Sequence, residues 1–303
     1  MSITDTHTQA GFVALIGASN AGKSTLMNAM VGQKISIVTP KVQTTRSRVR
    51  GIAMEGDSQI VFVDTPGIFS PKRRLDRAMI QAAWQGTEGT DIVLLVHDCA
   101  RAQIDEDTRA IIDRLNEMGA KASLVLNKID LVKPEQLLKR IEELNALFAF
   151  DETFMVSAET GEGIAHTRTW LAKQMPSGPF LFDPEDLSDS PLRLMAAEIM
   201  REKLFLNLHQ ELPYQLTVET ESWVDKKDGS VEIKMTIYVV RDGHRGIILG
   251  KGGQTLKRIG MAARYELEEA LERPVHLMSF VKVRKDWMDD KERYTSWDLD
   301  FNA

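Results

Sequence analysis

The sequence predicts an α/β fold with a doubly wound, mainly parallel sheet, followed by a smaller α+β domain. Three observations predict this: apolar runs alternate with amphipathic stretches up to about residue 174, a Pro-rich break follows at residues 176–191, and the order of elements then changes. Apolar strands that alternate with helices are typical of a parallel sheet covered on both faces. The change of pattern therefore indicates two domains of different architecture.

The first domain is expected to contain five strands separated by helices. Short runs rich in Val, Ile and Leu predict strands at residues 12–16, 59–63, 92–97, 123–126 and 154–156. Amphipathic stretches predict helices at residues 25–31, 76–85, 104–118 and 134–148. In such an open sheet, ligands bind beyond the carboxyl ends of the strands, so the loops at those ends are candidate binding loops.

The second domain is expected after a linker at residues 176–191, where two Pro clusters enclose acidic residues. The pattern then predicts a helix at 192–210, strands at 214–224 and 230–240, helices at 247–249 and 256–271, and a strand at 274–283. We therefore expect domains at residues 1–175 and 192–286, joined by that linker, and a C-terminal tail at 287–303.

Composition indicates a soluble protein. The 303 residues are 43% hydrophobic, which is enough for two cores, and the single cysteine, Cys99, excludes a disulfide framework. Residues 1–11 are polar and lack the apolar core of a signal peptide. The longest apolar runs are far shorter than the roughly 20 residues that span a bilayer. We therefore expect a cytoplasmic protein.

The net charge of −6 conceals a basic segment. Residues 234–285 contain eleven Lys and Arg residues against five acids, so this segment carries +6 while the rest of the chain carries −12. Such an asymmetry is expected of a local site for a polyanion, although ordinary solvated surfaces give the same pattern when charge is the only clue.

A phosphate-binding loop is predicted at residues 17–24, whose sequence GASNAGKS fits the pattern G-x-x-x-x-G-K-[ST]. It follows a predicted strand and opens a predicted helix, so backbone N–H groups and the helix N-terminus face the phosphates. Lys23 is expected to reach the β- and γ-phosphate oxygens and the Ser24 hydroxyl to bind Mg²⁺. The nucleotide-binding residues expected in this region are Gly17, Ser19, Asn20, Ala21, Gly22, Lys23, Ser24 and Thr25.

A second loop, DTPG at residues 64–67, directly follows a predicted apolar strand. The Asp64 carboxylate can hold Mg²⁺ through water, and Gly67 can donate its N–H to a γ-phosphate while letting the loop move. The tetrapeptide is a common turn by itself. After a phosphate-binding loop, it indicates a nucleotide site.

Two more loops are expected to bind the base. In NKID, the Asp130 carboxylate can accept from both N1–H and N2–H of guanine, donors that adenine lacks on that edge. Asn127 and Lys128 are expected to support this loop and stack along the base. Ser157 and Ala158 follow the last predicted strand, and the Ala158 N–H is expected to meet guanine O6.

These four loops, in this order, resemble the G1, G3, G4 and G5 motifs of the GTPase superfamily. The resemblance implies GTP and GDP as ligands, Mg²⁺ as cofactor, and hydrolysis of GTP to GDP and phosphate. It also implies a switch I loop at residues 39–46, in which Thr45, in preference to Thr44, ligates Mg²⁺ with Ser24 and Asp64.

The resemblance also bears on catalysis. Ras-like GTPases carry a Gln after this DxxG motif to orient the attacking water, whereas this chain has Ile68, which cannot hydrogen-bond a water. We expect Lys23, Asn20 and Gly67 to carry the catalytic roles. Related GTPases with Asn at the position of Asn20 use it to ligate K⁺, so K⁺ is a further expected cofactor. The alternative is that Asn20 merely shapes the loop.

A second site is predicted at GKGG, residues 250–253, between the two predicted helices of the second domain. Two glycines let a sugar–phosphate backbone approach the main chain, which is how a KH domain holds four nucleotides of single-stranded RNA. A lone G-x-x-G is more often a tight turn, but the basic segment and the preceding apolar residues favour RNA. The expected RNA-binding residues are Ile247, Ile248, Gly250, Lys251, Gly252, Gly253, Lys257 and Arg258.

The whole chain resembles the Era family, in which a GTPase domain is joined by a short linker to a type II KH domain. The resemblance rests on the GTPase motifs, on the sequence PKVQTTR at residues 40–46, and on the α–β–β–α–β order around G-x-x-G. It implies binding near the 3′ end of 16S ribosomal RNA. It also implies a role in assembly of the small, 30S ribosomal subunit.

Two other functions stay open at this point. A C-terminal domain that binds protein, or associates peripherally with a membrane, needs an exposed basic amphipathic helix or apolar face. Residues 192–210 are amphipathic, although a place in the core explains their apolar stripe equally well. A P-loop ATPase or kinase is opposed by the sequence NKID at residues 127–130.

Overall fold

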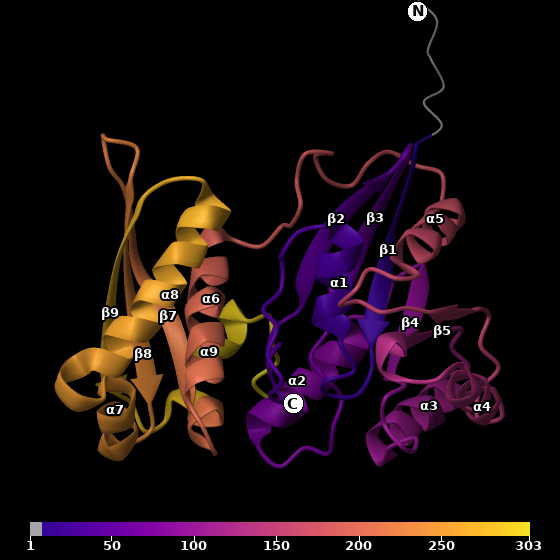
Figure 1. Cartoon of the computed structure of the whole chain (residues 1–303), viewed down its shortest axis with the longest axis horizontal. Helices are drawn as coiled ribbons and strands as arrows, with labels where there is room; N and C mark the ends of the chain where they lie inside the picture. Colours follow the sequence, from indigo (N-terminus) through magenta and orange to yellow (C-terminus); the bar gives the residue numbers. More distant parts are fainter. Residues whose placement is uncertain (1–7) are drawn as a thin grey trace, which may run out of the picture. The chain divides into compact units, whose positions relative to one another are not determined.

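The computed structural model describes residues 8–303, so part of the polar N-terminal segment, residues 1–7, lies outside the described residues. The chain forms two compact units (Figure 1). The first ends at Asp189 and also includes Glu292–Ala303, and the second is Ser190–Lys291. Each unit has its own hydrophobic core.

The first unit is built on a six-stranded sheet in the order β2-β3-β1-β4-β5-β6. The strands are β1 (Gln9–Ile16), β2 (Val49–Glu55), β3 (Ser58–Asp64), β4 (Ile92–Asp98), β5 (Ser123–Asn127) and β6 (Thr153–Met155). Strand β2 pairs antiparallel with β3, and the remaining neighbours pair in parallel. The predicted mainly parallel sheet is therefore confirmed.

Helices cover both faces of this sheet (Figure 1), as a doubly wound fold requires. They are α1 (Lys23–Val31), α2 (Arg74–Gln85), α3 (Glu106–Met118), α4 (Pro134–Asn145) and α5 (Ile164–Gln174). On one face, Leu26 of α1 and Leu171 of α5 are fully buried against the strands. On the other, Ala83, Ile111 and Leu144 bring α2, α3 and α4 into a second core cluster. The carboxyl ends of the parallel strands stay free to carry loops.

Strand β2 and helix α5 are not predicted from the sequence. Strand β2 includes Arg50, Gly51 and Glu55, which interrupt the alternation of apolar residues that indicates a strand. In α5, the buried position Thr167 is polar, and its hydroxyl donates to the Gly163 carbonyl 2.9 Å away. A polar residue on a buried face weakens the helical pattern, so both elements are identified only by their packing.

The second unit has the predicted α+β order. Its elements are α6 (Leu192–Asn207), β7 (Leu216–Asp225), β8 (Val231–Val239), α7 (Asp242–Leu249), α8 (Gln254–Leu271) and β9 (Val275–Val283). The sheet order is β7-β8-β9, with β7 antiparallel and β9 parallel to β8. Met200 of α6 and Ile259 of α8 share one core cluster with the strands. Among the described helices, none has the length and apolar character needed to cross a membrane.

Most of the segment predicted as a linker packs on the first unit. The Gln59 side chain donates to the Phe182 carbonyl at 2.9 Å and accepts from the Leu181 and Phe182 N–H groups. The Ile52 N–H donates to the Leu187 carbonyl at 2.9 Å. The Ile52 bond pairs a backbone N–H of the edge strand β2, and the Gln59 bonds attach the segment to a side chain of β3. Together they explain why the first unit continues to Asp189.

The segment predicted as a tail also differs from expectation, because its last twelve residues belong to the first unit. Asp298 forms an ion pair with Arg48, and the Arg77 Nε donates to the Ala303 carbonyl at 3.3 Å. The Arg74 guanidinium lies 4.6 Å from the centre of the Phe301 ring. The end of the chain thus contacts α2 and the residue that precedes β2 in the first unit.

Candidate functional site

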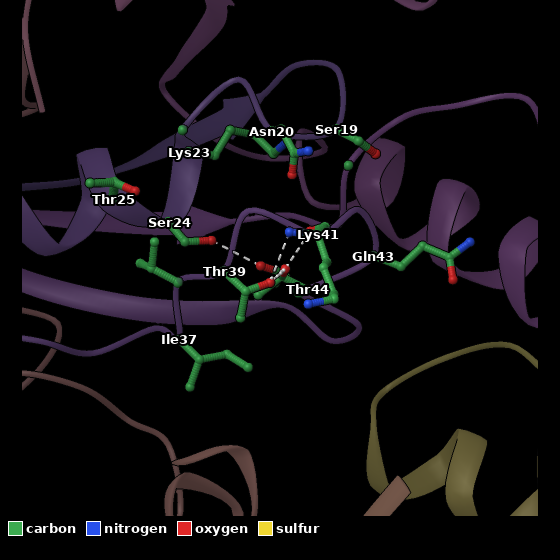
Figure 2. Close-up of a pocket in the computed structure, with 14 residues that line it drawn as sticks. Ser19, Asn20, Lys23, Ser24, Thr25, Ile37, Thr39, Lys41, Gln43 and Thr44 are labelled. Atoms are coloured by element: carbon green, nitrogen blue, oxygen red, sulfur yellow. Dashed lines mark hydrogen bonds between the residues drawn. The ribbon is translucent and has the colours of Figure 1, made fainter. Parts of the chain in front are cut away.

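The predicted phosphate-binding loop lies between β1 and α1, at the carboxyl edge of the sheet. Ser19, Asn20, Gly22 and Lys23 line a pocket there (Figure 2). A second segment also lines it, through Ile37, Val38, Thr39, Lys41, Gln43, Thr44 and Thr45. Ser24 and Thr25 line the same pocket, whereas Gly17 and Ala21 are buried behind the loop. The sequence therefore predicts the location of this pocket, and folding adds the second segment that borders it.

Lys23 is buried at the first position of α1. Its Nζ donates to the Gly17 and Ala18 carbonyls at 3.0 and 3.1 Å. Burial lowers the pKa of Lys23 to about 8, the Asp64 carboxylate opposes that change, and the Arg101 guanidinium adds to it. The ammonium group is therefore held inside its own loop, where an incoming phosphate can replace the two carbonyl oxygens as its partner.

Three hydroxyl groups converge on the Asp64 carboxylate at the end of β3. Ser24 Oγ, Ser36 Oγ and Thr45 Oγ1 lie 2.6, 3.0 and 3.4 Å from Asp64 Oδ2. Burial raises the pKa of the Asp64 carboxyl, and the charge of Lys23 and these hydrogen bonds oppose the rise. The predicted metal ligands Ser24, Thr45 and Asp64 therefore lie together.

The choice between Thr45 and Thr44 depends on which way each hydroxyl points. Thr45 Oγ1 lies 2.9 Å from Ser24 Oγ and faces the Asp64 carboxylate. Thr44 Oγ1 instead donates to the Lys41 carbonyl at 2.7 Å and lies 2.6 Å from Thr39 Oγ1. The orientation supports Thr45 as the metal ligand of this loop.

Asn20 connects the phosphate-binding loop to the predicted switch I segment. Its Nδ2 donates to the Pro40 carbonyl at 3.0 Å. Its backbone has φ 63°, a conformation that residues other than glycine seldom adopt. In Figure 2, Asn20 and Thr39 border the same pocket from these two segments. A change in the conformation of either segment therefore alters a hydrogen bond that the other segment makes.

Gly67 and Ile68 occupy different environments after β3. Gly67 lies against the phosphate-binding loop so closely that a Cβ there would come within 2.7 Å of Ser19 Oγ. Ile68 is buried in the core cluster below, and its N–H donates to the Gly17 carbonyl at 3.2 Å. Ile68 therefore points away from the pocket, and only Gly67 of this pair lines it.

Asn127 connects the two loops that are predicted to bind the base to the predicted phosphate-binding loop. Its Nδ2 donates to the Ala21 carbonyl at 3.0 Å, and its Oδ1 accepts from the Lys128 and Ala158 N–H groups. The Ala158 N–H, expected to meet guanine O6, is therefore directed at Asn127 instead, because Asn127 Oδ1 lies 3.1 Å away. The Asp130 side chain is exposed, as recognition of a base requires.

Some residues of this site carry no local signal in the sequence. Ser36, which adds a hydroxyl to Asp64, is an ordinary Ser in a loop. Asp98 at the end of β4 accepts from Lys128 Nζ at 2.6 Å, and Arg101 donates to the Ser19 carbonyl. Of these residues, only Asp98 has a signal in the sequence, because it ends an apolar run as Asp64 does.

The predicted second site, the G-x-x-G segment at residues 250–253, joins α7 to α8. Gly250 has φ 69°, and a Cβ there would overlap the Thr255 side chain, so the turn requires glycine. Lys251, Lys257 and Arg258 are exposed around it. The turn therefore combines accessible backbone with positive charge.

A groove of about 330 Å³ begins at this turn and runs between α8 and β9. Leu256, Met261 and Leu277 give it apolar walls, and Lys257 and Arg264 give it charge. Its volume falls within the roughly 300–1,000 Å³ that ligand sites occupy. The surface combines apolar contact area with cations.

One predicted RNA-binding residue is wrong as a contact. Ile248 is completely buried in the core of the second unit, whereas the neighbouring Ile247 is 58% exposed. Successive residues of a helix point in different directions, so α7 can present only one of the two to a ligand. Ile248 therefore supports the helix from below.

Comparison with protein families identifies both units. Residues 12–128 match the family described as 50S ribosome-binding GTPase, and residues 211–288 match the KH domain family. Relatives named GTPase Era include those of Dinoroseobacter shibae, 58% identical over 97% of this chain and 96% of the relative, and of Rhizobium meliloti, 55% identical over 97% and 94%.

Solved structures agree with this comparison. A variant of Aquifex aeolicus Era bound to GDP and AlF₄⁻ matches 96% of this chain and 99% of its own, with 35% identity and a TM-score of 0.90. Era in complex with MgGDPNP and nucleotides 1506–1542 of 16S ribosomal RNA matches with the same coverage and TM-score at 36% identity. With both units matched over nearly their whole length, this chain belongs to the Era family of GTPases.

Proposed function

We propose that this GTPase is a molecular switch that binds single-stranded RNA near the 3′ end of 16S ribosomal RNA and acts in assembly of the 30S subunit in the cytoplasm. The observation that carries the RNA half is the exposed G-x-x-G turn at the end of a basic, apolar-walled groove. The Era complex with nucleotides 1506–1542 of 16S ribosomal RNA supports the choice of RNA.

GTP and GDP are proposed to bind with their phosphates against residues 17–25 and with Mg²⁺ held by Ser24, Thr45 and Asp64. The donors present support this, because buried Asp64 Oδ1 has no hydrogen-bond partner among the described residues, and hydroxyls flank Oδ2. Mg²⁺ prefers oxygen ligands of this kind. Bound there, Mg²⁺ neutralises charge on the β- and γ-phosphate oxygens.

The chain's own groups then divide the remaining work. Lys23 exchanges its two carbonyl partners for phosphate oxygens and brings a positive charge to them. Gly67 offers its N–H beside the γ-phosphate, and the Asp130 carboxylate selects guanine by accepting two hydrogen bonds. The aliphatic part of Lys128 lies beside the phosphate-binding loop, since a Cβ added to Gly22 would lie 3.9 Å from Lys128 Cε. From there the Lys128 side chain can pack along the base.

K⁺ is proposed as a second cation, held by Asn20. The support is geometric: Asn20 stands at the edge of the phosphate pocket, and its Nδ2 donates to switch I, so the amide oxygen is the atom left for a cation. The test is the rate of GTP hydrolysis in K⁺ and in Na⁺. We expect faster hydrolysis in K⁺ and no difference in Asn20→Ala, whereas equal rates of the unmodified protein in both salts would refute this role.

The RNA proposal is tested by placing negative charge on the G-x-x-G turn. In the double variant Lys251→Asp, Gly252→Asp, two carboxylates and a Cβ stand where phosphates must lie, so RNA affinity is expected to fall below detection. Fluorescence anisotropy with a single-stranded oligonucleotide of the 16S 3′ end measures this. GTP titration of the same sample is expected to give unchanged affinity, because the nucleotide site lies in the other unit.

A matched control makes the same two kinds of change in the turn between β7 and β8. Lys227→Asp, Gly229→Asp in the β7–β8 turn alters charge equally and also substitutes a glycine with positive φ, 85° against 60°. This control is expected to reduce RNA affinity only slightly. Equal loss in both variants would show that net charge, and not the turn, determines binding, and retained affinity in the first variant would refute the KH site.

Peripheral membrane association is the competing use of the second unit. It loses support because the apolar stripe of α6, including Ala196, Met200, Leu204 and Phe205, is buried in the core. Co-sedimentation with anionic liposomes tests it directly. Binding to liposomes that survives Lys251→Asp, Gly252→Asp would favour the membrane alternative.

A further inference from the structure

Two cationic side chains from neighbouring loops contact consecutive carbonyl groups of the phosphate-binding loop. Arg101, in the loop between β4 and α3, donates from Nη2 to the Ser19 carbonyl at 2.7 Å. Lys128, which follows β5, donates from Nζ to the Asn20 carbonyl at 3.0 Å. The Lys128 contact belongs to the NKID motif, whereas the Arg101 contact has no counterpart in the motifs that define the site.

Arg101 is held firmly at both ends. Its Nη1 lies 2.7 Å from Asp105 Oδ2, and its Nε lies 3.9 Å from Asp98 Oδ2. The Arg140 Nη2 of α4 donates to the Arg101 backbone carbonyl at 2.8 Å. A guanidinium whose planar fork is oriented by a carboxylate loses little further entropy when its remaining N–H groups bond another acceptor. The contact with Ser19 is therefore preorganised.

Fixing the Ser19 carbonyl also fixes the N–H of Asn20. Both belong to one planar trans peptide group, in which the C=O and N–H bonds point in opposite directions. With the carbonyl directed at Arg101, the Asn20 N–H is directed away from Arg101. Asn20 itself has φ 63°, a conformation that persists in a residue other than glycine when its surroundings hold it.

We propose that Arg101 is a positioning residue for GTP hydrolysis, which orients the Ser19–Asn20 peptide so that the Asn20 N–H and side chain face the β- and γ-phosphates. Arg101 acts through Asn20 and touches no phosphate itself. The positive charge of Arg101 also acts on Lys23, whose pKa it helps to lower. The competing explanation is that Arg101 only ties the β4–α3 loop to the fold through Asp105.

The test compares Arg101→Met, Arg101→Lys and the control Arg114→Met. Methionine keeps an unbranched apolar stem but no donor, and lysine keeps the charge and its N–H donors, all on a single nitrogen. Arg114 lies on α3, pairs with Glu117 at 3.0 Å and is 56% exposed. Three quantities are measured on the full chain: the single-turnover rate of GTP hydrolysis, GDP affinity, and the melting temperature.

We expect Arg101→Met to slow hydrolysis about tenfold while GDP affinity changes less than about threefold, since charge builds on the oriented phosphates in the transition state. Arg101→Lys, which keeps the charge but not the planar fork, is expected to recover part of the rate, and Arg114→Met to behave like the unmodified protein. An unchanged rate in Arg101→Met, parallel losses of rate and GDP affinity, or failure of lysine to rescue would each overturn the proposal.

A second variant keeps the test decisive if Arg101→Met does not fold. Asp105 caps α3 by accepting from the Thr108 N–H at 2.9 Å, and Asn caps helices as well as Asp does. Asp105→Asn therefore preserves the helix and loosens Arg101. We expect hydrolysis to slow a few-fold at unchanged GDP affinity, and an unchanged rate in this folded variant would overturn the proposal.

Discussion

At the scale of single residues, burial acts in opposite directions on the two charged groups at the centre of the nucleotide site. Lys23 has its pKa lowered to about 8, and Asp64 has its pKa raised, in both cases mainly because burial disfavours the charged form. Each group also favours the charged form of the other. A phosphate beside Lys23 and a divalent cation beside Asp64 would each add a further opposite charge and so offset the effect of burial. The arrangement therefore favours a charged ligand.

Asp130 should determine the choice of base. In Asp130→Asn the amide donates where the carboxylate accepted, so affinity for GTP should fall and affinity for xanthosine triphosphate should rise, since xanthine has an acceptor in place of the guanine amine. Competition titrations with a fluorescent nucleotide measure both affinities. A variant that still prefers GTP would contradict the role of Asp130, and unchanged thermal melting controls for folding.

His97 should make the first unit less stable in acid. Burial lowers the pKa of His97 to about 4, and the Arg140 charge adds to this, whereas an unfolded His titrates near 6.5. As pH falls from about 6.5 to about 4, His97 binds a proton in the unfolded state but stays neutral in the native state. The free energy of unfolding therefore falls by roughly 3 kcal/mol. Above pH 6.5 this contribution is constant.

The measurement is the free energy of unfolding against pH for the unmodified protein and for His97→Gln. Other groups titrate identically in both, so the difference between the two curves isolates His97. The variant should lose less stability between pH 6.5 and 4. Parallel curves would show that His97 does not stay neutral in the native state.

At the scale of elements, helix α7 has one face buried in the core of the second unit and one face exposed to solvent. Ile248 lies in the core of the second unit, whereas Ile247 and Gly246 face outward beside the G-x-x-G turn. The glycines after the helix give the turn its shape, and the buried isoleucine holds the helix in place. The predicted contact surface therefore depends on a buried residue that is not part of it.

Substitution of the two isoleucines should separate these roles. Ile248→Ala removes fully buried atoms and should destabilise the second unit by about 2–5 kcal/mol. Ile247→Ala, at an exposed position, should change stability by at most about 0.5 kcal/mol. Thermal or urea unfolding of the two variants measures this difference, and similar losses in both would contradict the orientation of α7.

At the scale of the whole molecule, the chain returns to its first unit after completing the second. Residues 190–291 form the second unit, and Glu292–Ala303 belongs to the first. Tyr294, Trp297 and Leu299 of this last segment are buried. The first unit is therefore made of two segments that are far apart in the sequence, and its last segment contributes buried side chains.

Trp297→Ala should therefore weaken the GTPase unit and spare the KH unit. Loss of a buried Trp side chain costs about 3–5 kcal/mol. Addition of GDP with Mg²⁺ identifies the transition of the first unit in thermal unfolding, because a ligand stabilises only the unit that binds it. The variant should lower that transition, and a lowered GDP-insensitive transition would contradict the assignment of the segment.

The parts of this protein that the sequence determines by itself are those whose residues are neighbours along the chain. The phosphate-binding loop, DTPG, NKID and the G-x-x-G turn each consist of a few adjacent residues whose conformation depends on local backbone geometry. The strand that precedes each GTPase loop is a short apolar run. The sequence therefore predicts five strands of the sheet, the nucleotide site, the KH unit and the Era family.

Only the tertiary structure decides the contacts between residues that are far apart in the sequence. The orientation of Thr45 rather than Thr44, the burial of Ile248, the contact of Arg101 with Ser19 and the return of Trp297 to the first unit all depend on how helices and loops pack. Neither the charge of Arg101 nor the hydropathy of Ile248 indicates a direction in space. A side chain's direction is set by the element that carries it and by the neighbours that folding brings against it.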